Sequence, residues 1–476
     1  MLKNRYSFAS VILIVIILFI YLFGHNDIYI QNAITLEPAT DFGVEISIWR
    51  ILFEPILGVM LFLLRSQAWL AEPFYMFVWF FVVYLLYSVY YTFRIAESNK
   101  IVVFLRKMLL APAFLIFYIA FILIIVVAPL PANRIVNNAE NTILVNTHSH
   151  SDYSHDGLIS QENLRKWHKR NNFDAFFITD HGHHKNTLEY VNYLKEKDDT
   201  DLPVVMVGEE YSGSNHITIL GLDRDFDTKG YSDARAIDSA HAQNGVAITA
   251  HWFQGERNSL EYYRDQGVDG FEIEKQGKHI TYNRDTYASI KSFASENNLI
   301  MNGAVDYHGH GEACFVWNAF EIPGWNDLNY EEKEESILSV IRNREQDKLK
   351  VLIYRDREYY YSDYLWFSPV LNFYSYFRSL NFYQILSWIV WIIVMNFMMR
   401  NVKITSYSFT NSVLIKSLFL SLFILLLGLN YRLRIPGVSP PNEIYEEYSN
   451  IMLILGFAAI LYFGVVLFYN IRKTKS

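Results

Sequence analysis

The sequence has little charge and almost no cysteine. Only 19% of its 476 residues are charged, while aromatic residues make up 17%. In an ordinary globular domain about a quarter of the residues are charged. Low charge combined with many Tyr and Phe residues excludes a disordered chain and argues against one soluble globule. The single Cys314 excludes an internal disulfide and any zinc site built from several cysteine thiolates.

An excess of basic residues is also missing. The 41 Lys and Arg residues against 49 Asp and Glu residues give a formal net charge of −8. No cationic surface of the kind that binds nucleic acid is indicated, so we expect no nucleic-acid partner. Of the 14 histidines, 13 lie between residues 140 and 350, as do 36 of the 49 acidic residues. This distribution predicts a polar, histidine-rich domain held between two apolar flanks.

The flanks contain uncharged stretches of the length that a spanning helix needs, about 20 residues. The expected spans are residues 7–23, 73–93, 108–130, 380–399, 411–430 and 450–471. Lys416 is the only charged residue within them. Residues 46–64 are a weaker seventh candidate because they contain Arg50, Glu54 and Pro55, and they would either lie in the interface or cross. Buried core helices are the alternative explanation for all of these stretches.

The positions of Lys and Arg predict the orientation. The basic residues near both termini and in the loops after residues 93 and 399 all fall in the cytoplasm if three spans lie on each side of the central domain. We therefore expect a multi-pass integral protein of a bacterial inner membrane. Residues 1–133 form one membrane region, residues 134–355 form an extracytoplasmic domain, and residues 356–476 form an aromatic connector and a second membrane region. Arg432 and Arg434, which would then lie outside, argue against this orientation.

In the central region, short apolar runs alternate with amphipathic stretches. The expected strands are residues 143–147, 175–179, 204–208, 216–220, 246–250, 270–273, 300–305 and 349–353. The expected helices include residues 161–170, 233–243, 284–296 and 331–344, with Ser160 and Ser232 as N-caps. Strands that alternate with helices are typical of an α/β fold with a mainly parallel sheet. Seven or eight such units predict a barrel.

Histidines and carboxylates stand at the ends of successive predicted strands. They are His148, His150, Asp156, Asp180, His181, Glu209, Glu210, His216, His251, Asp306 and His308. The carboxyl ends of parallel barrel strands meet at one face. Imidazole and carboxylate ligands without sulfur suit Zn, Mn or Fe, and adjacent ions bridged by a carboxylate are common in phosphate ester hydrolysis. One strand-end histidine alone is more often structural, but buried charges gathered together must be paired or bound to metal.

In this order the motifs resemble the PHP family, named after polymerase and histidinol phosphatase. The motifs are His-x-His with Ser-His-Asp-Gly, then Thr-Asp-His, Gly-x-Glu, a later His, Ala-His and Asp-x-His, over residues 141–353. The resemblance implies a distorted (β/α)7 barrel of the TIM type, two or three divalent metal ions, and hydrolysis of phosphoesters. By position it implies three ligand groups: His148, His150, Glu210 and Asp306; Glu210, His216 and His251; and Asp156, His181 and His308.

Residues outside these motifs are candidates for proton transfer and phosphate binding. The candidate general acids are His155, His183 and His184. The candidate phosphate ligands are Arg257, Lys275, Lys278 and Arg284. A solvated loop or plain surface charge is the alternative for each of them. Asp180 is expected to orient its neighbours, and Cys314 is expected to be a buried apolar residue.

The leading hypothesis is a membrane-anchored, metal-dependent phosphoesterase that uses activated water. Its substrate would be a lipid-linked, envelope-derived or scavenged phosphoester. One alternative is a catalytically silent domain that senses a metal or ligand and is coupled to the membrane helices; loss of a ligand would favour it, and all nine positions bear a residue able to ligate. A transporter is a further alternative, but the spans contain few ionisable residues.

Overall fold

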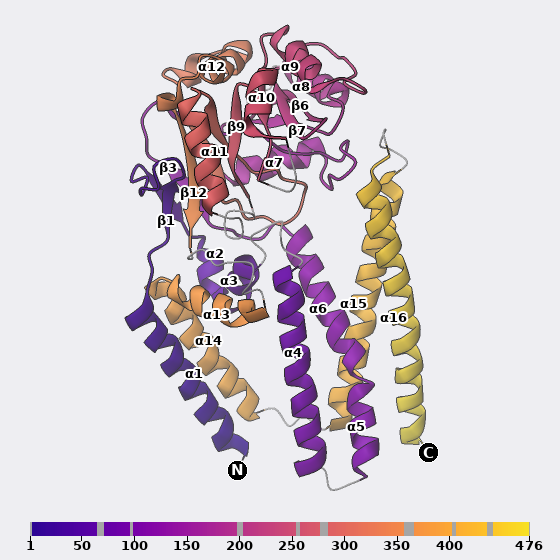
Figure 1. Cartoon of the computed structure of the whole chain (residues 1–476). Coiled ribbons are helices and arrows are strands. Elements are labelled where there is room, and N and C mark those ends of the chain that lie inside the picture. The colour runs from indigo at the N-terminus through magenta and orange to yellow at the C-terminus, as the bar shows by residue number, and fades with distance from the viewer. Residues whose placement is uncertain are drawn as a thin grey trace.

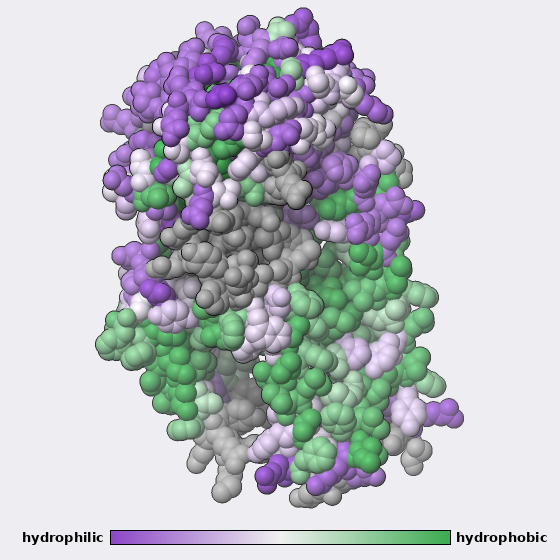
Figure 2. Space-filling model, viewed as in Figure 1, coloured by the Kyte–Doolittle hydropathy of each residue, from purple (hydrophilic) through white to green (hydrophobic). Residues whose placement is uncertain are grey.

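The computed structural model describes residues 2–63, 71–95, 99–197, 203–253, 258–276, 284–356, 366–401, 406–435 and 441–475. A sheet domain lies at one end of the molecule and a layer of long helices at the other, with both termini at the end of the helical layer remote from the sheet (Figure 1). On the face shown in Figure 2, hydrophilic residues predominate over the domain and hydrophobic residues over the helical layer.

The domain is built on a ten-stranded mixed sheet with the order β1-β12-β11-β4-β5-β6-β7-β8-β9-β10. Its strands are β1 (Tyr29–Asn32), β4 (Thr142–Asn146), β5 (Ala175–Ile178), β6 (Val204–Ser212), β7 (His216–Leu220), β8 (Val246–Thr249), β9 (Gly270–Lys275), β10 (Ile300–Ala304), β11 (Val316–Glu321) and β12 (Leu349–Arg355). A separate antiparallel pair consists of β2 (Phe42–Glu45) and β3 (Arg134–Asn137). Every strand predicted from the sequence is therefore present, and β1, β2, β3 and β11 are additional.

The sheet curls so that β10 approaches β4. A parallel bridge between Ser149 and Tyr307 joins the residues that follow these strands, and the His150 N–H donates to the Tyr307 carbonyl at 2.8 Å. The α/β class is thus confirmed, but regular seven-unit alternation is not observed. Strand β7 is antiparallel to both β6 and β8. Residues 213–215 form a tight turn between β6 and β7, where a regular barrel unit would have a helix.

The strands are buried on both faces, which explains their nearly continuous apolar sequences. Successive residues of β5 belong to different apolar clusters: Phe176 and Ile178 lie in one, and Ala175 and Phe177 in the other. The helices of the domain are α7 (Gln161–Arg170), α8 (Lys185–Glu196), α9 (Asp233–His241), α10 (Leu260–Gln266), α11 (Arg284–Glu296) and α12 (Tyr330–Arg342), with 3-10 turns η2 (Trp325–Asp327) and η3 (Gln346–Lys348).

Two predicted N-caps can be compared with the helix starts. Ser232 precedes α9 and accepts a hydrogen bond from the Arg235 N–H, as predicted. Ser160 occupies the N-cap position of α7, but its side chain makes no capping bond.

The helical layer contains the apolar flanks. Its helices are α1 (Leu2–Gly24), α2 (Ile48–Leu52), α3 (Glu54–Leu63), α4 (Ala71–Tyr90) with the π-helical turn η1 (Tyr91–Ile95), α5 (Lys100–Met108), α6 (Ala111–Val127), α13 (Ser368–Arg378), α14 (Phe382–Asn401), α15 (Ser406–Arg434) and α16 (Glu443–Lys475). Among the described residues, three helices are long and apolar enough to cross a membrane: Pro73–Arg94, Thr410–Arg434 and Glu443–Arg472. They contain the predicted spans 73–93, 411–430 and 450–471.

The other predicted spans differ from that description. Residues 7–23 and 108–130 correspond to the shorter apolar segments Phe8–Gly24 and Ala111–Val127. At about 1.5 Å per residue, Ala111–Val127 is shorter than a hydrocarbon core of about 30 Å, whereas Phe8–Gly24 is part of the 23-residue helix α1. Residues 382–399 of the predicted span 380–399 lie in α14, which passes the same test only together with α13, from which it is bent by 114°. The described part of 46–64 is split into α2 and α3, and neither is long enough to cross alone.

A strand from the N-terminal flank completes the domain. Strand β1 pairs antiparallel with β12, so that Tyr29 lies opposite Arg355 and Asn32 opposite Leu352. The sheet therefore includes residues from before the predicted domain boundary at residue 134. Of the predicted aromatic connector, residues 357–365 lie outside the described part of the chain, and α13 begins at Ser368.

Candidate metal centre

The nine side chains that the family resemblance selected lie together at one edge of the sheet. We call them the strand-end cluster: His148, His150, Asp156, His181, Glu210, His216, His251, Asp306 and His308. The strands β4, β5, β6, β8 and β10 bring their carboxyl ends to this edge. Because β7 runs the opposite way, its first residue, His216, reaches the same place.

One group of donor atoms is fully buried. The Nε2 atoms of His148 and His150 are 3.1 Å apart, and each lies 3.0 Å from Glu210 Oε2. Asp306 Oδ1 completes the group at 3.0 Å from His150 Nε2. Two imidazole nitrogens and two carboxylate oxygens that converge this closely require a proton or a cation between them.

The carboxyl group of Glu210 joins this group to a second one. Its Oε1 atom lies 2.7 Å from His216 Nδ1 and 3.0 Å from His251 Nε2, while Oε2 faces His148 and His150. The geometry is that of a bridging carboxylate. Gly208 of the Gly-x-Glu motif allows the neighbouring strands to approach, because a Cβ there would lie 2.9 Å from the Ile219 carbonyl oxygen.

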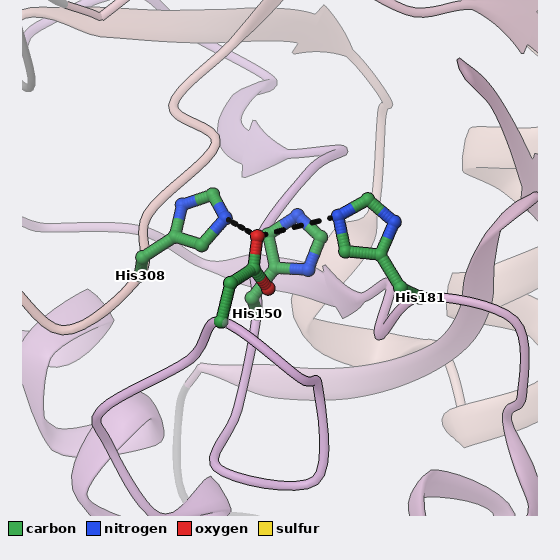
Figure 3. Close-up of side chains that lie close together, drawn as sticks. His150, His181 and His308 are labelled. Atoms are coloured by element: carbon green, nitrogen blue, oxygen red, sulfur yellow. Dashed lines mark hydrogen bonds and ion pairs between the residues drawn. The ribbon is translucent and has the colours of Figure 1, made fainter. Parts of the chain in front are cut away.

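A third group surrounds Asp156. Its Oδ2 atom lies 3.0 Å from His308 Nε2 and 3.4 Å from His181 Nε2. Figure 3 shows the rings of His150, His181 and His308 gathered around this carboxylate. The His150 ring lies between the first and third groups, with its centroid 4.2 Å from that of His308.

The backbone at two cluster positions is strained. His251 has a φ of 28° and Asp306 a φ of 51°, a region that residues other than glycine rarely adopt. Such conformations cost about 1–3 kcal/mol each and occur mainly at functional sites. The strain places both side chains at the end of their strands and toward the cluster.

The charges of the cluster compensate one another. Burial by itself lowers the pKa of His150, but hydrogen bonds with Asp306 and Glu210 raise it to about 10. Burial by itself raises the pKa of Glu210, but His148 and His181 hold it well below its usual value. In the metal-free protein, protonated His148 and His150, whose pKa values are raised by the surrounding carboxylates, therefore supply positive charge that divalent ions would supply when bound.

Two further residues support the cluster, and one of them, Glu272, was not singled out from the sequence. Glu272 on β9 is fully buried, lies 2.7 Å from His148 Nδ1 and accepts the His251 N–H at 2.9 Å. It therefore fixes the ring of His148 with Nε2 facing the cluster. Lys275, predicted as a phosphate ligand, is instead buried against Asp306. The predicted strand 270–273 already contained Glu272 between Phe271 and Ile273. An acidic residue between two apolar residues of a buried strand was the signal that could have identified it.

The neighbours of the ligand positions have separate roles. Asp180 accepts hydrogen bonds at 2.6 Å from both the backbone N–H and the hydroxyl of Ser151, in keeping with its predicted orienting role. Glu209 points away from the cluster and lies 2.6 Å from His184 Nδ1. His184 is thereby held in a buried pair, which removes it as a candidate general acid.

The remaining candidates are dispersed. His155 is half-exposed, with its ring centroid 4.7 Å from that of His181. His183 Nε2 lies 3.0 Å from the Tyr153 carbonyl oxygen. Arg257 and Lys278 lie outside the described residues, and of Arg284 only the helical backbone is described. Cys314 is buried, as expected.

A family model for the PHP domain matches residues 146–314. The match covers a little over a third of the chain and includes the whole strand-end cluster. Together with the converging imidazoles and carboxylates, it supports a metal-dependent hydrolase that binds divalent metal ions.

Solved structures also resemble the chain. One is a protein of Bifidobacterium adolescentis described as a metal-dependent phosphoesterase, with 15% identity over 35% of this chain and 88% of that chain and a TM-score of 0.29. PsfC of Pseudomonas syringae has 17% identity over 44% of this chain and 98% of its own chain, with a TM-score of 0.31. An amidohydrolase from Chromobacterium violaceum has 13% identity over 40% of this chain and 96% of its own chain, with a TM-score of 0.30. No curated protein matches the chain.

Proposed function

We propose that the protein is a membrane-anchored hydrolase of phosphoric ester bonds that uses two or three divalent metal ions. The bridging geometry of Glu210, with its two oxygens facing two groups of imidazoles, supports this function most directly. Clamps of neighbouring metal ions are a common means of phosphate ester hydrolysis.

The proposed ligands follow the three groups of donor atoms. His148, His150, Glu210 and Asp306 would hold one ion. Glu210, His216 and His251 would hold a second, and Asp156, His181 and His308 a third. Nitrogen and oxygen donors without sulfur favour Zn, Mn or Fe.

When bound, such ions lower the pKa of water and offset charge on the transferring phosphoryl group. The chain's own residues would orient the ester and move its protons. His155 stands at the rim next to His181 and is half-exposed, so we propose it as the proton carrier for the leaving oxygen. His183 is second choice because its Nε2 is already engaged by the Tyr153 carbonyl. Arg257 stays a candidate phosphate ligand.

The test uses the full chain purified in detergent, stripped with a chelator and reloaded with Mn²⁺ or Zn²⁺. We expect hydrolysis of an aryl phosphate monoester or diester that requires the metal. His148→Ala and Asp306→Ala remove buried donors and should abolish it. Metal-independent activity, or full activity in both variants, would contradict the proposal.

We further propose that the domain is extracytoplasmic in a bacterial inner membrane. Three helices long and apolar enough to cross a membrane, and termini that share the end remote from the domain (Figure 1), support opposite sides for termini and domain. A reporter fused after Ser476 should be active in the cytoplasm, and protease added outside should reach residues 140–350. The reverse pattern would overturn the orientation but not the chemistry.

The substrate class we propose is a phosphoester linked to a lipid or derived from the cell envelope. The loops that carry the ligands contact the helical layer: the Gly311 N–H donates to the Val126 carbonyl of α6 at 2.9 Å, and the Ile444 N–H of α16 donates to the His155 carbonyl at 3.2 Å. A site at this boundary favours a substrate presented at a membrane surface. Hydrolysis of a lipid phosphate in mixed micelles should exceed that of its soluble headgroup analogue in kcat/KM, and equal values would contradict this preference.

A further inference from the structure

The loop of residues 151–158 lies between the strand-end cluster and the helical layer. It carries His155 and Asp156, and Asp156 is the carboxylate of the third group of donor atoms. On one side the loop is anchored by Ser151, which donates two hydrogen bonds to Asp180. On its other side it meets the start of α16, one of the three helices that could cross a membrane.

Asn442 makes this second contact. Its side chain is fully buried. Its amide Nδ2 donates to the carbonyl oxygens of Gly157 at 2.6 Å and Ser154 at 2.7 Å, with a longer contact of 3.3 Å to that of Asp152. Its Oδ1 atom accepts the Tyr445 N–H at 2.9 Å. One side chain therefore caps the first turn of α16 and holds three carbonyl groups of the loop.

These contacts lead directly to the carboxylate. The hydroxyl of Ser154, whose carbonyl Asn442 holds, donates to Asp156 Oδ1 at 2.6 Å. That leaves Oδ2 facing His308 and His181. The backbone N–H of Ile444 adds a bond to the His155 carbonyl, and Leu158 is buried in an apolar cluster with residues of α6, α15 and α16.

We propose that Asn442 is a positioning residue for the third metal ion, so that this part of the site is complete only when the α15–α16 hairpin is docked on the domain. The proposal rests on the proposed metal site and adds a dependence of that site on a membrane-type helix. The first group depends less on this contact, because none of its four residues lies within the 151–158 loop: they come from β6 and from the segments that follow β4 and β10, with His150 directly preceding the loop.

Two substitutions separate positioning from helix capping. Asn442→Asp keeps an oxygen that accepts the Tyr445 N–H, but it removes the N–H donors and sets a carboxylate against the loop carbonyls. Asn442→Ala removes both functions. If Asn442 serves only as a cap, Asn442→Asp should behave like the wild type; if it positions the loop, both variants should be impaired.

The first measurement is Mn²⁺ binding to the metal-free full chain in detergent. We expect Asn442→Asp to weaken one ion by roughly 10- to 100-fold, the range found when a partner of a ligand is removed, and to leave the others unchanged. Asp156→Asn should weaken the same ion. The double variant should lose little more than Asp156→Asn alone, because both act on one carboxylate.

The second measurement needs no metal and no activity. Amide hydrogen exchange in the metal-free Asn442→Asp variant should be faster in residues 151–158 and unchanged in β6, which also reports that the domain is folded. Unchanged exchange in the loop, wild-type affinity for every ion, or an equal loss for all ions would each overturn the inference. If the loop loosens and one ion weakens although no phosphoester is hydrolysed, the proposed activity fails and the positioning role stands.

Discussion

Glu209 and Glu210 show how adjacent residues of one strand can take unrelated roles. Successive side chains of a strand point to opposite faces, so Glu210 faces the imidazoles of the strand-end cluster while Glu209 faces His184 and Thr228. Both are buried. Their identical chemistry makes them a matched pair for separating metal binding from stability.

We expect Glu210→Gln to weaken metal binding at both groups that Glu210 joins, because the amide removes the shared negative charge and replaces one of the two oxygens with an NH2 group. Glu209→Gln should bind metal normally but lose about 1–3 kcal/mol of unfolding free energy, since His184 loses its charged partner. Metal analysis and thermal unfolding of the two variants check this. Equal metal loss in both would refute the assignment of Glu210 as the bridge.

The sequence located the ligand positions because His and carboxylate residues recur in order at strand ends. The Gly-x-Glu spacing favoured Glu210 over Glu209, although the glutamate that faces the cluster depends on which face of β6 is turned inward. It also missed Glu272, because the position of a single acidic residue between Phe271 and Ile273 does not show which side chain it contacts. Its role depends on the contact with His148, which is 124 residues away.

Because His150 carries a proton in the metal-free cluster, both metal affinity and stability should depend on pH. Its pKa of about 10 in the metal-free cluster means that a metal ion must displace a proton near neutrality. Affinity should therefore rise with pH, by about tenfold per pH unit for each proton displaced. For the metal-free protein the sign is opposite: stabilisation by protonated His150 is complete below its ordinary pKa of 6.5 and is lost as pH rises through about 10. Metal titrations and unfolding at several pH values test both, and a pH-independent affinity would contradict the first.

At the scale of elements, the 151–158 loop depends on Gly157. A Cβ at this position would lie 1.8 Å from the Ser151 carbonyl oxygen, so the loop closes only around a glycine. We expect Gly157→Ala to weaken the third metal ion, held through Asp156, and to spare the first. Gly43→Ala is the control, because its Cβ would make an ordinary contact at 3.8 Å. Calorimetric metal titration distinguishes them, and normal binding by Gly157→Ala would count against the described loop.

The predicted elements were correct where periodicity extended over a whole strand or helix, as in α7 and α11. The antiparallel β7 was predicted as a strand but not in its direction. Direction depends on the connection, and the three-residue turn before His216 leaves no room for a helix. Strand β1 was missed because its four residues follow a long apolar helix and are too few to show an alternation of apolar and polar side chains. Their strand conformation depends on the pairing with β12.

At the scale of the whole molecule, a buried ion pair joins the two layers. Arg50 Nε lies 3.5 Å from Glu54 Oε2, and Glu54 also accepts hydrogen bonds at 2.8 Å from Tyr376 and Gln384. Arg50 reaches Asn133, which in turn donates to the Tyr354 hydroxyl on β12. These two charged residues made the predicted seventh span weak, and the structure uses them to connect α2, α3, α13 and α14 with the sheet.

Glu54→Ala should destabilise the full chain by about 3–5 kcal/mol, because it leaves the Arg50 charge buried without its carboxylate. Replacing both residues, as Arg50→Met with Glu54→Leu, should cost less than the single change, since no unpaired charge remains. Thermal unfolding in detergent measures both variants. A double variant that is less stable than Glu54→Ala would show that the pair contributes net stability.

The pairing of β1 with β12 has a practical consequence for anyone who wishes to study the domain without its helices. A fragment of residues 134–355 would leave the β12 edge open along Val351, Leu352 and Ile353, and open apolar edges promote association; light scattering should show oligomers. Because Tyr29 lies opposite Arg355, residues 29–45 could be attached after residue 355 through a two-residue hairpin turn. That rearranged chain would carry its own edge strand and should be monomeric. The domain therefore needs the segment that contains β1, but not its natural position between α1 and α2.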